Sequence, residues 1–416
     1  MTTASRAHRA ILRSALVLCP VLALSGLPAL PADDGGEVRT LIDALRKGEA
    51  AFSIRYRWEH VDDDIPAVAD EDGDASTLRT TLSYRTAPLF GFNAFMEFED
   101  VSNLGMSNDH NDTTNGIVDH PVIADPVGTD LQQAYLRYSS PEIVGVSAGR
   151  MTLSLAPERY VGPVGWRQNQ QSFDAAEVSV SAIPRTTLRL IYIDNVQRIF
   201  GDNREMSSPL VDAAVKIGQA ARLTAYWYRL DYDQLADAAL STSTAGGRWE
   251  HAWRLPGEWS IPYLAEYAKQ SDAGDNPADV DAEYRRLEVG GKRRMLSLVA
   301  GYELLGGDLS DGAFSTPLAT LHTWNGWADT FLTTPPIGLQ DLYLSAGYGW
   351  NSWSGTVIWH DFSSDSEDVS YGTEIDAVVQ WKAPWKQIFA GKAAFFEADE
   401  AGFDTQKYWI YTAWSM

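Results

Sequence analysis

Arginine recurs at alternate positions in short segments where apolar and polar residues also alternate. In residues 52–59, Arg55 and Arg57 lie between Ile54, Tyr56 and Trp58, so an extended chain would place both guanidinium groups on one face and the apolar side chains on the other. A guanidinium group can hold a carboxylate through two parallel hydrogen bonds. A row of such groups along a wall would therefore attract acidic solutes. The candidate basic wall residues are Arg55, Arg57, Arg79, Arg85, Arg137 and Arg189.

Acidic residues occupy equivalent polar positions, mostly in other segments. Because the two signs of charge are separated along the chain, the pattern predicts a transverse field across a wet pore rather than one sign throughout. The alternative is that these acids pair with the arginines, which would then only complete the wall. The candidate acidic wall residues are Glu97, Glu99, Glu266, Glu374 and Asp376.

Two longer segments have the composition of a constriction. Residues 160–173 follow an arginine and contain a run of amides, which can bind sugar hydroxyls or carboxylates. Residues 316–336 carry aromatic and apolar side chains at helical spacing and end at two prolines, which predicts a helix. The alternative is that both segments are packed outer loops whose aromatic rings bury one another. The candidate constriction residues are Arg159, Arg167, Gln168, Asn169, Gln170, Trp324, Trp327 and Phe331.

Alternating strands are needed to position all these side chains. From residue 51 to residue 416 the chain alternates between short turns, such as 86–91 and 382–386, and long polar loops, such as 102–130. Its last strand, 408–416, runs to the chain end, where it can pair with the first strand and leave no open edge. The pattern predicts an all-β fold: a transmembrane antiparallel β-barrel of about 18 strands, with short periplasmic turns and long extracellular loops. A soluble β-sandwich or propeller pair would expose many aromatic side chains to water.

The N-terminus has the pattern of an export signal. Three arginines precede the apolar run 15–24, and small residues follow up to Ala32. We expect residues 1–32 to be a signal peptide; a lipid anchor at Cys19, the sequence's one cysteine, is the alternative. Residues 33–50 are expected to form a periplasmic N-terminal segment with a short helix, and residues 51–416 the barrel in the outer membrane of a Gram-negative cell.

Composition narrows the class of partner. A net charge of -23 without a basic stripe argues against nucleic acid. The acidic clusters lack the spacing of a calcium loop and are expected to be solvated loops, with cations that bridge to lipopolysaccharide as the alternative. No common catalytic motif is present, and His360 and Asp361, adjacent on a strand, would point to opposite faces. We therefore expect no enzyme, no metal site and no cofactor.

Several motifs resemble one family. The sequences TLRTTLSY (77–84), VGWRQNQQSFDA (164–175), YIDNVQRIFG (192–201), FSTPLATLHTWNGWADTFLTTPP (314–336) and HDF (360–362) are similar to the alginate-export-type outer-membrane porins. The resemblance runs from residue 52 to the end and implies an eighteen-stranded channel, with an alginate-like polyanion as one candidate cargo. The expected function is a porin for passive passage of small hydrophilic or anionic solutes, including acidic sugars. A receptor or adhesin with a plugged, non-conducting barrel is the alternative. The expected partners are the lipid bilayer, lipopolysaccharide, the barrel assembly machinery and a small-molecule or oligosaccharide solute.

Overall fold

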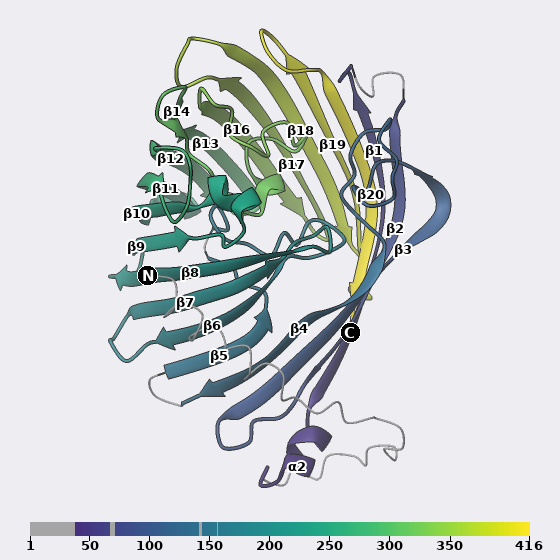
Figure 1. Ribbon diagram of the computed structural model, residues 1–416, viewed down its shortest axis with the longest axis vertical. Coiled ribbons are helices and arrows are strands. Elements are labelled where there is room, and N and C mark those ends of the chain that lie inside the picture. The colour runs from purple at the N-terminus through teal and green to yellow at the C-terminus, as the bar shows by residue number, and fades with distance from the viewer. Residues whose placement is uncertain (1–37, 67–70, 141–143, 156) are drawn as a thin grey trace.

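The chain forms one closed barrel of eighteen antiparallel strands (Figure 1). The structure is a computed structural model that describes residues 38–66, 71–140, 144–155 and 157–416, so the expected signal peptide lies outside it. Each strand pairs with the next, and β20 pairs with β1 from Ser53↔Ser415 to Asp63↔Thr405. The predicted fold class is confirmed. The barrel strands are β1 (Glu49–Asp63), β2 (Gly73–Arg85), β3 (Phe92–Asp109), β4 (Gly128–Ser139), β5 (Val144–Met151), β6 (Ser172–Val180), β7 (Thr186–Gln197), β8 (Asn203–Ile217), β9 (Ala221–Leu230), β10 (Thr242–Arg254), β11 (Trp259–Asp272), β12 (Asp281–Arg293), β13 (Leu296–Leu305), β16 (Leu339–Trp350), β17 (Trp353–Ser363), β18 (Ser370–Lys382), β19 (Ile388–Ala398) and β20 (Thr405–Ser415).

The burial pattern is the reverse of that in a water-soluble protein. Leu344 and Ile375 are 53% and 50% exposed, whereas Glu374 and Asp376, on either side of Ile375, are fully buried. Alternation along each strand thus places apolar side chains outside the barrel and charged ones inside it. An outer surface of this kind is stable only against hydrocarbon. The barrel therefore lies in the outer membrane.

The two ends of the barrel differ in the length of their links. One end carries short turns, such as 294–295 between β12 and β13 and 351–352 between β16 and β17. At this end lies helix α2 (Leu41–Arg46), which begins with a capping box between Thr40 and Asp43. The Ala87 amide in the β2–β3 turn donates to the Ala44 carbonyl over 2.9 Å, which fixes α2 to the turn end. No helix among the described residues is long and apolar enough to cross a membrane.

The opposite end carries the long loops, and two of them, 152–171 and 306–338, fold into the barrel. The expected helix in 316–336 is wrong, because only Leu321–Thr323 forms a 3-10 turn (η3). Asn325, Gly326 and Asp329 have positive φ angles of 53°, 86° and 61°, which interrupt a right-handed helix. The remaining short elements are β14 (Gly307–Asp308), β15 (Gly312–Ala313), η1 (Leu235–Leu240) and η2 (Pro256–Glu258).

Candidate functional site

The inner wall carries the charged side chains that the sequence singled out. Strand register places Arg55 opposite Arg79 and Arg248 opposite Glu266, and residues paired in this way share one face of the sheet. Arg85, Arg137, Arg189, Glu97, Glu99, Glu374 and Asp376 lie on the same inward face by alternation. The structure does not, however, gather these residues at one place. Some lie beneath the two inward loops, and others lie near the turn end.

The loop 152–171 is bonded directly to β1 and β2. Arg55 donates from Nε to Gln168 Oε1 over 2.9 Å and from Nη1 to the Gly165 carbonyl over 2.8 Å. Gln168 is fully buried and donates from Nε2 to Thr77 Oγ1 over 2.9 Å. Arg57 donates to the Trp166 carbonyl over 2.7 Å. This loop is therefore seated on the wall by hydrogen bonds to its backbone and amide groups.

Arg167 connects the two inward loops to each other and to the wall. Its Nη1 lies 3.1 Å from Glu59 Oε1 on β1, and its Nη2 lies 3.0 Å from Asp329 Oδ2 in the loop 306–338. Burial by itself would lower the pKa of Arg167, but the charges of Glu59 and Asp329 outweigh it and raise the pKa. Burial would likewise raise the pKa of Asp329, yet the neighbouring cationic groups hold it well below its usual value. Both groups stay ionised in the cluster.

A second anchor joins Arg159 to the far wall. Arg159 is 1% exposed, and its Nε lies 3.0 Å from Glu303 Oε1 on β13. Its Nη2 donates to Asn325 Oδ1 over 2.9 Å, and its guanidinium lies 5.1 Å from the centroid of Trp324. The two loops also pair directly, through a parallel bridge between Val161 and Leu318. Glu303 was not among the predicted residues, although its place in an alternating strand indicates an inward side chain.

Lys392 occupies an aromatic cage that the sequence did not reveal. Its Nζ lies 3.8 Å from the ring centroid of Trp327, 4.2 Å from that of Trp166 and 4.9 Å from that of Trp409. The ammonium group lies 2.5 Å from Nε2 of His322, whose Nδ1 lies 2.7 Å from Asp329 Oδ1. Trp166 and His322 stack at 4.4 Å with 8° between their planes. One lysine of β19 thus holds residues of both loops through cation–π and polar contacts.

The remaining predicted constriction residues also contact the wall or a neighbouring loop. Asn169 Nδ2 donates to the Pro126 carbonyl over 2.7 Å, and the Gln170 amide donates to Glu99 over 3.1 Å. The Trp327 amide donates to Asp376 over 3.1 Å. Phe331 packs on Phe362, with 4.7 Å between ring centroids. The two loops therefore fill part of the barrel interior.

Three of the predicted wall arginines are held in ion pairs. Arg57 pairs with Asp125 and with Glu59, and is 1% exposed. Arg79 lies 2.6 Å from Glu99. Burial would raise the pKa of Asp125, but Arg57 and Arg167 hold it below its usual value. Lumenal acids thus hold Arg57 and Arg79 at mid-depth. Arg189 lies nearer the turn end and pairs with Glu177 at 2.6 Å, and Arg85 and Arg137 also lie nearer the turn end.

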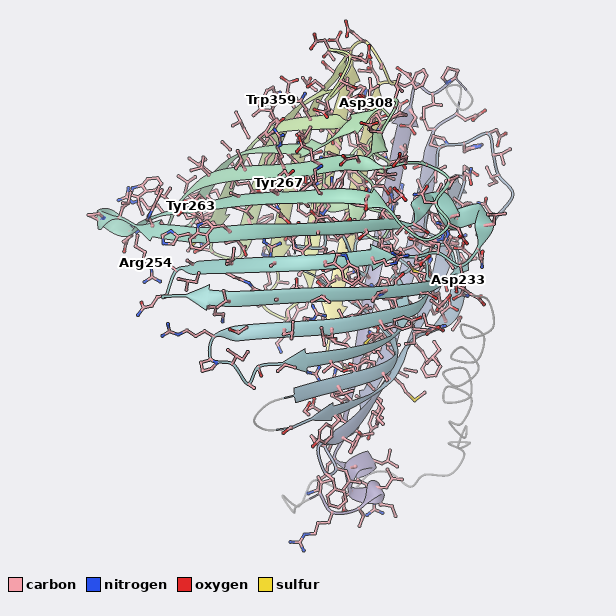
Figure 2. All side chains as sticks on the ribbon, turned by 60° about the vertical axis from the view of Figure 1, so that its left-hand side comes forward. Asp233, Arg254, Tyr263, Tyr267, Asp308 and Trp359 are labelled. Atoms are coloured by element: carbon pink, nitrogen blue, oxygen red, sulfur yellow. The ribbon has the colours of Figure 1, made fainter. Side chains whose placement is uncertain are left out.

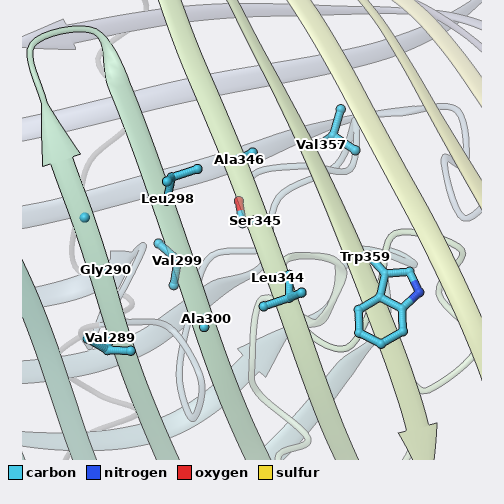
Figure 3. A pocket seen from close by; sticks show the side chains of 11 residues that line it. Val289, Gly290, Leu298, Val299, Ala300, Leu344, Ser345, Ala346, Val357 and Trp359 are labelled. Atoms are coloured by element: carbon cyan, nitrogen blue, oxygen red, sulfur yellow. The ribbon is translucent and has the colours of Figure 1, made fainter.

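One hollow lies on the outer face of the barrel rather than in its interior. It has a volume of about 510 Å³ and lies over β12, β13, β16 and β17, where small residues such as Ala300 and Ala346 are bordered by Val289, Leu344 and Trp359 (Figure 3). Its lining is almost entirely apolar. This hollow faces lipid and takes no part in the wall chemistry.

Comparison with known proteins agrees with this architecture. The family model described as alginate export matches residues 48–300. OccK9 (OpdG) of Pseudomonas aeruginosa superposes with a TM-score of 0.71 at 14% identity, over 90% of this chain and 99% of that one. OccAB4 of Acinetobacter baumannii gives 0.65 at 14% identity, over 89% and 98% of the two chains. P. aeruginosa OpdK, solved with vanillate, gives 0.63 at 17% identity, over 89% and 100%.

These structural likenesses are too low in identity to establish more than the fold. No curated protein sequence matches the chain. The family model, by contrast, covers more than half of the sequence. The chain is therefore a member of the alginate export family, built as an outer-membrane β-barrel.

Proposed function

We propose that the protein is an outer-membrane channel for passive passage of small acidic solutes. The observation that carries the proposal is a lipid-facing barrel whose inner wall bears guanidinium groups and whose interior is narrowed by two docked loops. Arg189 is 22% exposed and lies beside Glu177 at 2.6 Å, and Arg137 is an exposed arginine on the same inward face. Such partly hydrated groups can exchange an internal carboxylate for that of a passing solute.

Small carboxylates are the favoured solute class. Arg57 and Arg79 are held by acids, so the available positive charge comes from arginines nearer the turns, such as Arg85 and Arg137. One structural neighbour, OpdK, was solved with vanillate, a small carboxylate. Acidic sugars and short oligouronates carry the same group, and an alginate-like polyanion is the largest member of this class. The proposal includes no catalytic step, no metal and no cofactor.

Export and assembly belong to the same proposal. Residues 1–32 would direct the chain across the inner membrane, and the barrel assembly machinery would insert it by way of its C-terminal strand. Lipopolysaccharide would contact the acidic outer loops through bridging cations.

A plugged receptor or adhesin is the second candidate function. It is favoured by the many buried contacts that hold the loops 152–171 and 306–338 to the wall. The two functions differ in a single observable, because a plugged barrel conducts no ions.

Planar-bilayer recording of the purified full-length barrel tests the proposal. We expect the channel to conduct ions and, in a salt gradient, to show a reversal potential that indicates anion selectivity. Galacturonate oligomers should block the current, and neutral maltotriose should not. Replacing Arg85, Arg137 and Arg189 together by Gln should shift the reversal potential toward cations and weaken the block. Absence of conduction would favour the plugged receptor. A cation-selective pore that the triple variant leaves unchanged would contradict the acidic-solute proposal.

A further inference from the structure

The turn end of the barrel is basic. Ten lysine and arginine side chains lie at this end of the barrel. Only one of them, Arg294, has an ion pair within the described ranges, with Glu258 at 2.6 Å. Asp43, Glu49, Glu250 and Glu258 are the acids that the described chain contributes to this end. Glu49 lies opposite Arg85 and Glu250 opposite Arg222. The turn-end cations of the barrel are Arg85, Arg185, Lys216, Arg222, Arg254, Lys292, Arg293, Arg294, Lys382 and Lys386.

The loop end of the barrel carries an excess of acidic residues that is larger than the excess of basic residues at the turn end. In its described links, apart from the two inward loops, Arg198 is the one lysine or arginine, and it lies 2.5 Å from Asp202. The cations at the loop ends of β8, β9 and β11 are ion-paired as well: Arg204 with Asp237, Arg229 with Asp231 and Lys269 with Asp281. Figure 2 shows the contrast directly, with Arg254 at one extremity of the strands and Asp233 at the other. The loop-end acids are Asp64, Glu71, Asp72, Asp119, Asp202, Asp231, Asp233, Asp237, Asp275, Asp279, Asp308, Asp311, Asp365, Glu367, Asp368, Asp399, Glu400 and Asp404.

Several turn-end cations face the mouth of the barrel. Lys216 follows Asp212 and Ala214 on the inward face of β8, and Arg222 of β9 is its direct partner. Two like charges placed opposite each other destabilise a sheet. Glu250, which neighbours Arg222 on β10, is already engaged by Arg248 at 3.3 Å. This pair of cations does not stabilise the fold. It can, however, bind the carboxylates of a solute.

The two ends act independently on a solute. Sixteen of the eighteen barrel strands have ten or more residues, so at about 3.3 Å per residue the rims lie roughly 25 Å or more apart even when the strands are tilted. The Debye length at physiological salt is about 8 Å, so neither rim screens the other. The charge of the whole molecule therefore says little about the field at either mouth.

We infer that the channel is electrostatically polarised along its axis, so that carboxylate-bearing solutes enter from the periplasmic mouth much faster than from outside. The basic turn end concentrates such solutes, and the acidic loop end repels them. This inference rests on the proposed function and adds a direction to it. It requires no conformational change, because the asymmetry is fixed in the turns and loops.

Oriented single-channel recording tests the polarity. Orientation is read from an Ala278→Cys variant, whose exposed loop position reacts with a membrane-impermeant maleimide added to one chamber. A galacturonate trimer is then added to either side at 50 mM and 500 mM salt. We expect the rate of blocking events to be at least tenfold higher from the turn side at low salt, and the difference to shrink at high salt.

A matched pair of variants locates the effect. Arg222→Gln with Lys292→Gln removes two inward-facing cations and should lower the turn-side blocking rate about threefold. Arg293→Gln with Arg294→Gln removes the same charge from an outward stack on Trp259 and from the exposed turn, and should leave the rate unchanged. Folding of each variant is checked by its heat-dependent gel mobility.

The outcomes separate this inference from the proposed function. An anion-selective wild-type channel that is blocked equally from both sides would overturn the polarity alone. A channel without anion selectivity would overturn the proposed function itself. A turn-side blocking rate that Arg222→Gln with Lys292→Gln leaves unchanged would show that the mouth cations do not concentrate the solute, which also contradicts the inference. The wild-type comparison decides even if a variant does not fold.

Discussion

Replacing Arg167 by Met should release the inward loops from the wall. The apolar stem of the side chain is largely retained, while the guanidinium that contacts Glu59 at 3.1 Å and Asp329 at 3.0 Å is lost. Both carboxylates are nearly inaccessible to water, with 1% and 3% of their side-chain surface exposed. The variant therefore leaves two buried negative charges short of a cation.

The free-energy cost of Arg167→Met follows from the burial of these carboxylates. Removing one partner of a buried ion pair costs about 3–5 kcal/mol. Lys407, at 3.4 Å from Asp329, retains part of the compensation for one carboxylate, so we take the lower bound of about 3 kcal/mol. At about 1.4 kcal/mol per factor of ten, this raises the population of undocked loops by roughly two orders of magnitude. Hydrogen exchange of the amides in 152–171 and 316–336 should accelerate by that factor, and single-channel current should become larger and noisier.

Arg198→Met is the matched control. It removes the same groups from an ion pair with Asp202 whose members are 26% and 46% exposed. Exposed pairs contribute at most about 1 kcal/mol, so exchange in the inward loops should not change. If Arg167→Met exchanges at the wild-type rate in those loops, the ion pairs do not hold them and the reasoning is wrong.

Three further predictions use other parts of the molecule. Burial lowers the pKa of His322 to about 3, so below pH 6.5 the undocked loop binds a proton that the docked loop excludes. The free energy that protects the loop amides from hydrogen exchange should therefore fall by up to about 2 kcal/mol between pH 7.5 and pH 5. His322→Asn should remove most of this pH dependence. Lys392→Met removes the cation from its cage beside His322 and should raise exchange in both loops, measured by the same experiment. Trp359→Arg places a charge against lipid at a cost of about 2–4 kcal/mol and should reduce the yield of folded barrel in membrane fractions. The yield should fall well below that of Arg137→Ala, which changes an exposed arginine of the inward face; equal yields would show that the two faces are reversed.

The barrel could be predicted from sequence because its signal is local. Alternation at period two assigns each side chain to a face, so it places Arg55 and Trp58 on opposite faces without knowledge of any partner. Link length then gave the strand count and the direction of the turns. Closure between β1 and β20 followed from the physical need to leave no edge in hydrocarbon.

The docking of the loops could not be predicted because its contacts are remote in sequence. Arg167 and Asp329 are 162 residues apart, and Arg159 and Glu303 are 144 apart. Neither pair leaves a periodic mark in the chain. The helical spacing in 316–336 was misleading, since its aromatic side chains pack against the wall from an irregular backbone. Lys392 escaped notice because its partners, Trp166 and Trp327, come from two different loops.

The chemistry of the wall is better understood from what a loop requires inside a barrel. An eighteen-stranded barrel is too wide to be filled by its own side chains, and a loop that enters it brings backbone groups that need partners away from water. The charged side chains of the wall supply these partners: cationic groups bond to loop carbonyls and anionic groups to loop amides. Arg55 and Arg57 donate to carbonyls of 152–171, whereas Glu374 and Asp376 accept from the amides of Ala328 and Trp327 at 2.8 and 3.1 Å.

The charged side chains of the wall at mid-depth thus hold the inward loops by hydrogen bonds. Arginines lie where the loop presents a carbonyl, and carboxylates lie where it presents an amide. Of the arginines nearer the turns, Arg189 donates to the Ser154 carbonyl of the loop 152–171 over 2.9 Å. Most of the cations at the turns themselves, Arg222 among them, have no ion pair in the described ranges. A charge that folding does not use is the one available to a solute. Selectivity should therefore respond to substitutions near the turns, such as Arg222→Gln, more than to substitutions at Arg57, which should instead loosen the loop that Arg57 holds.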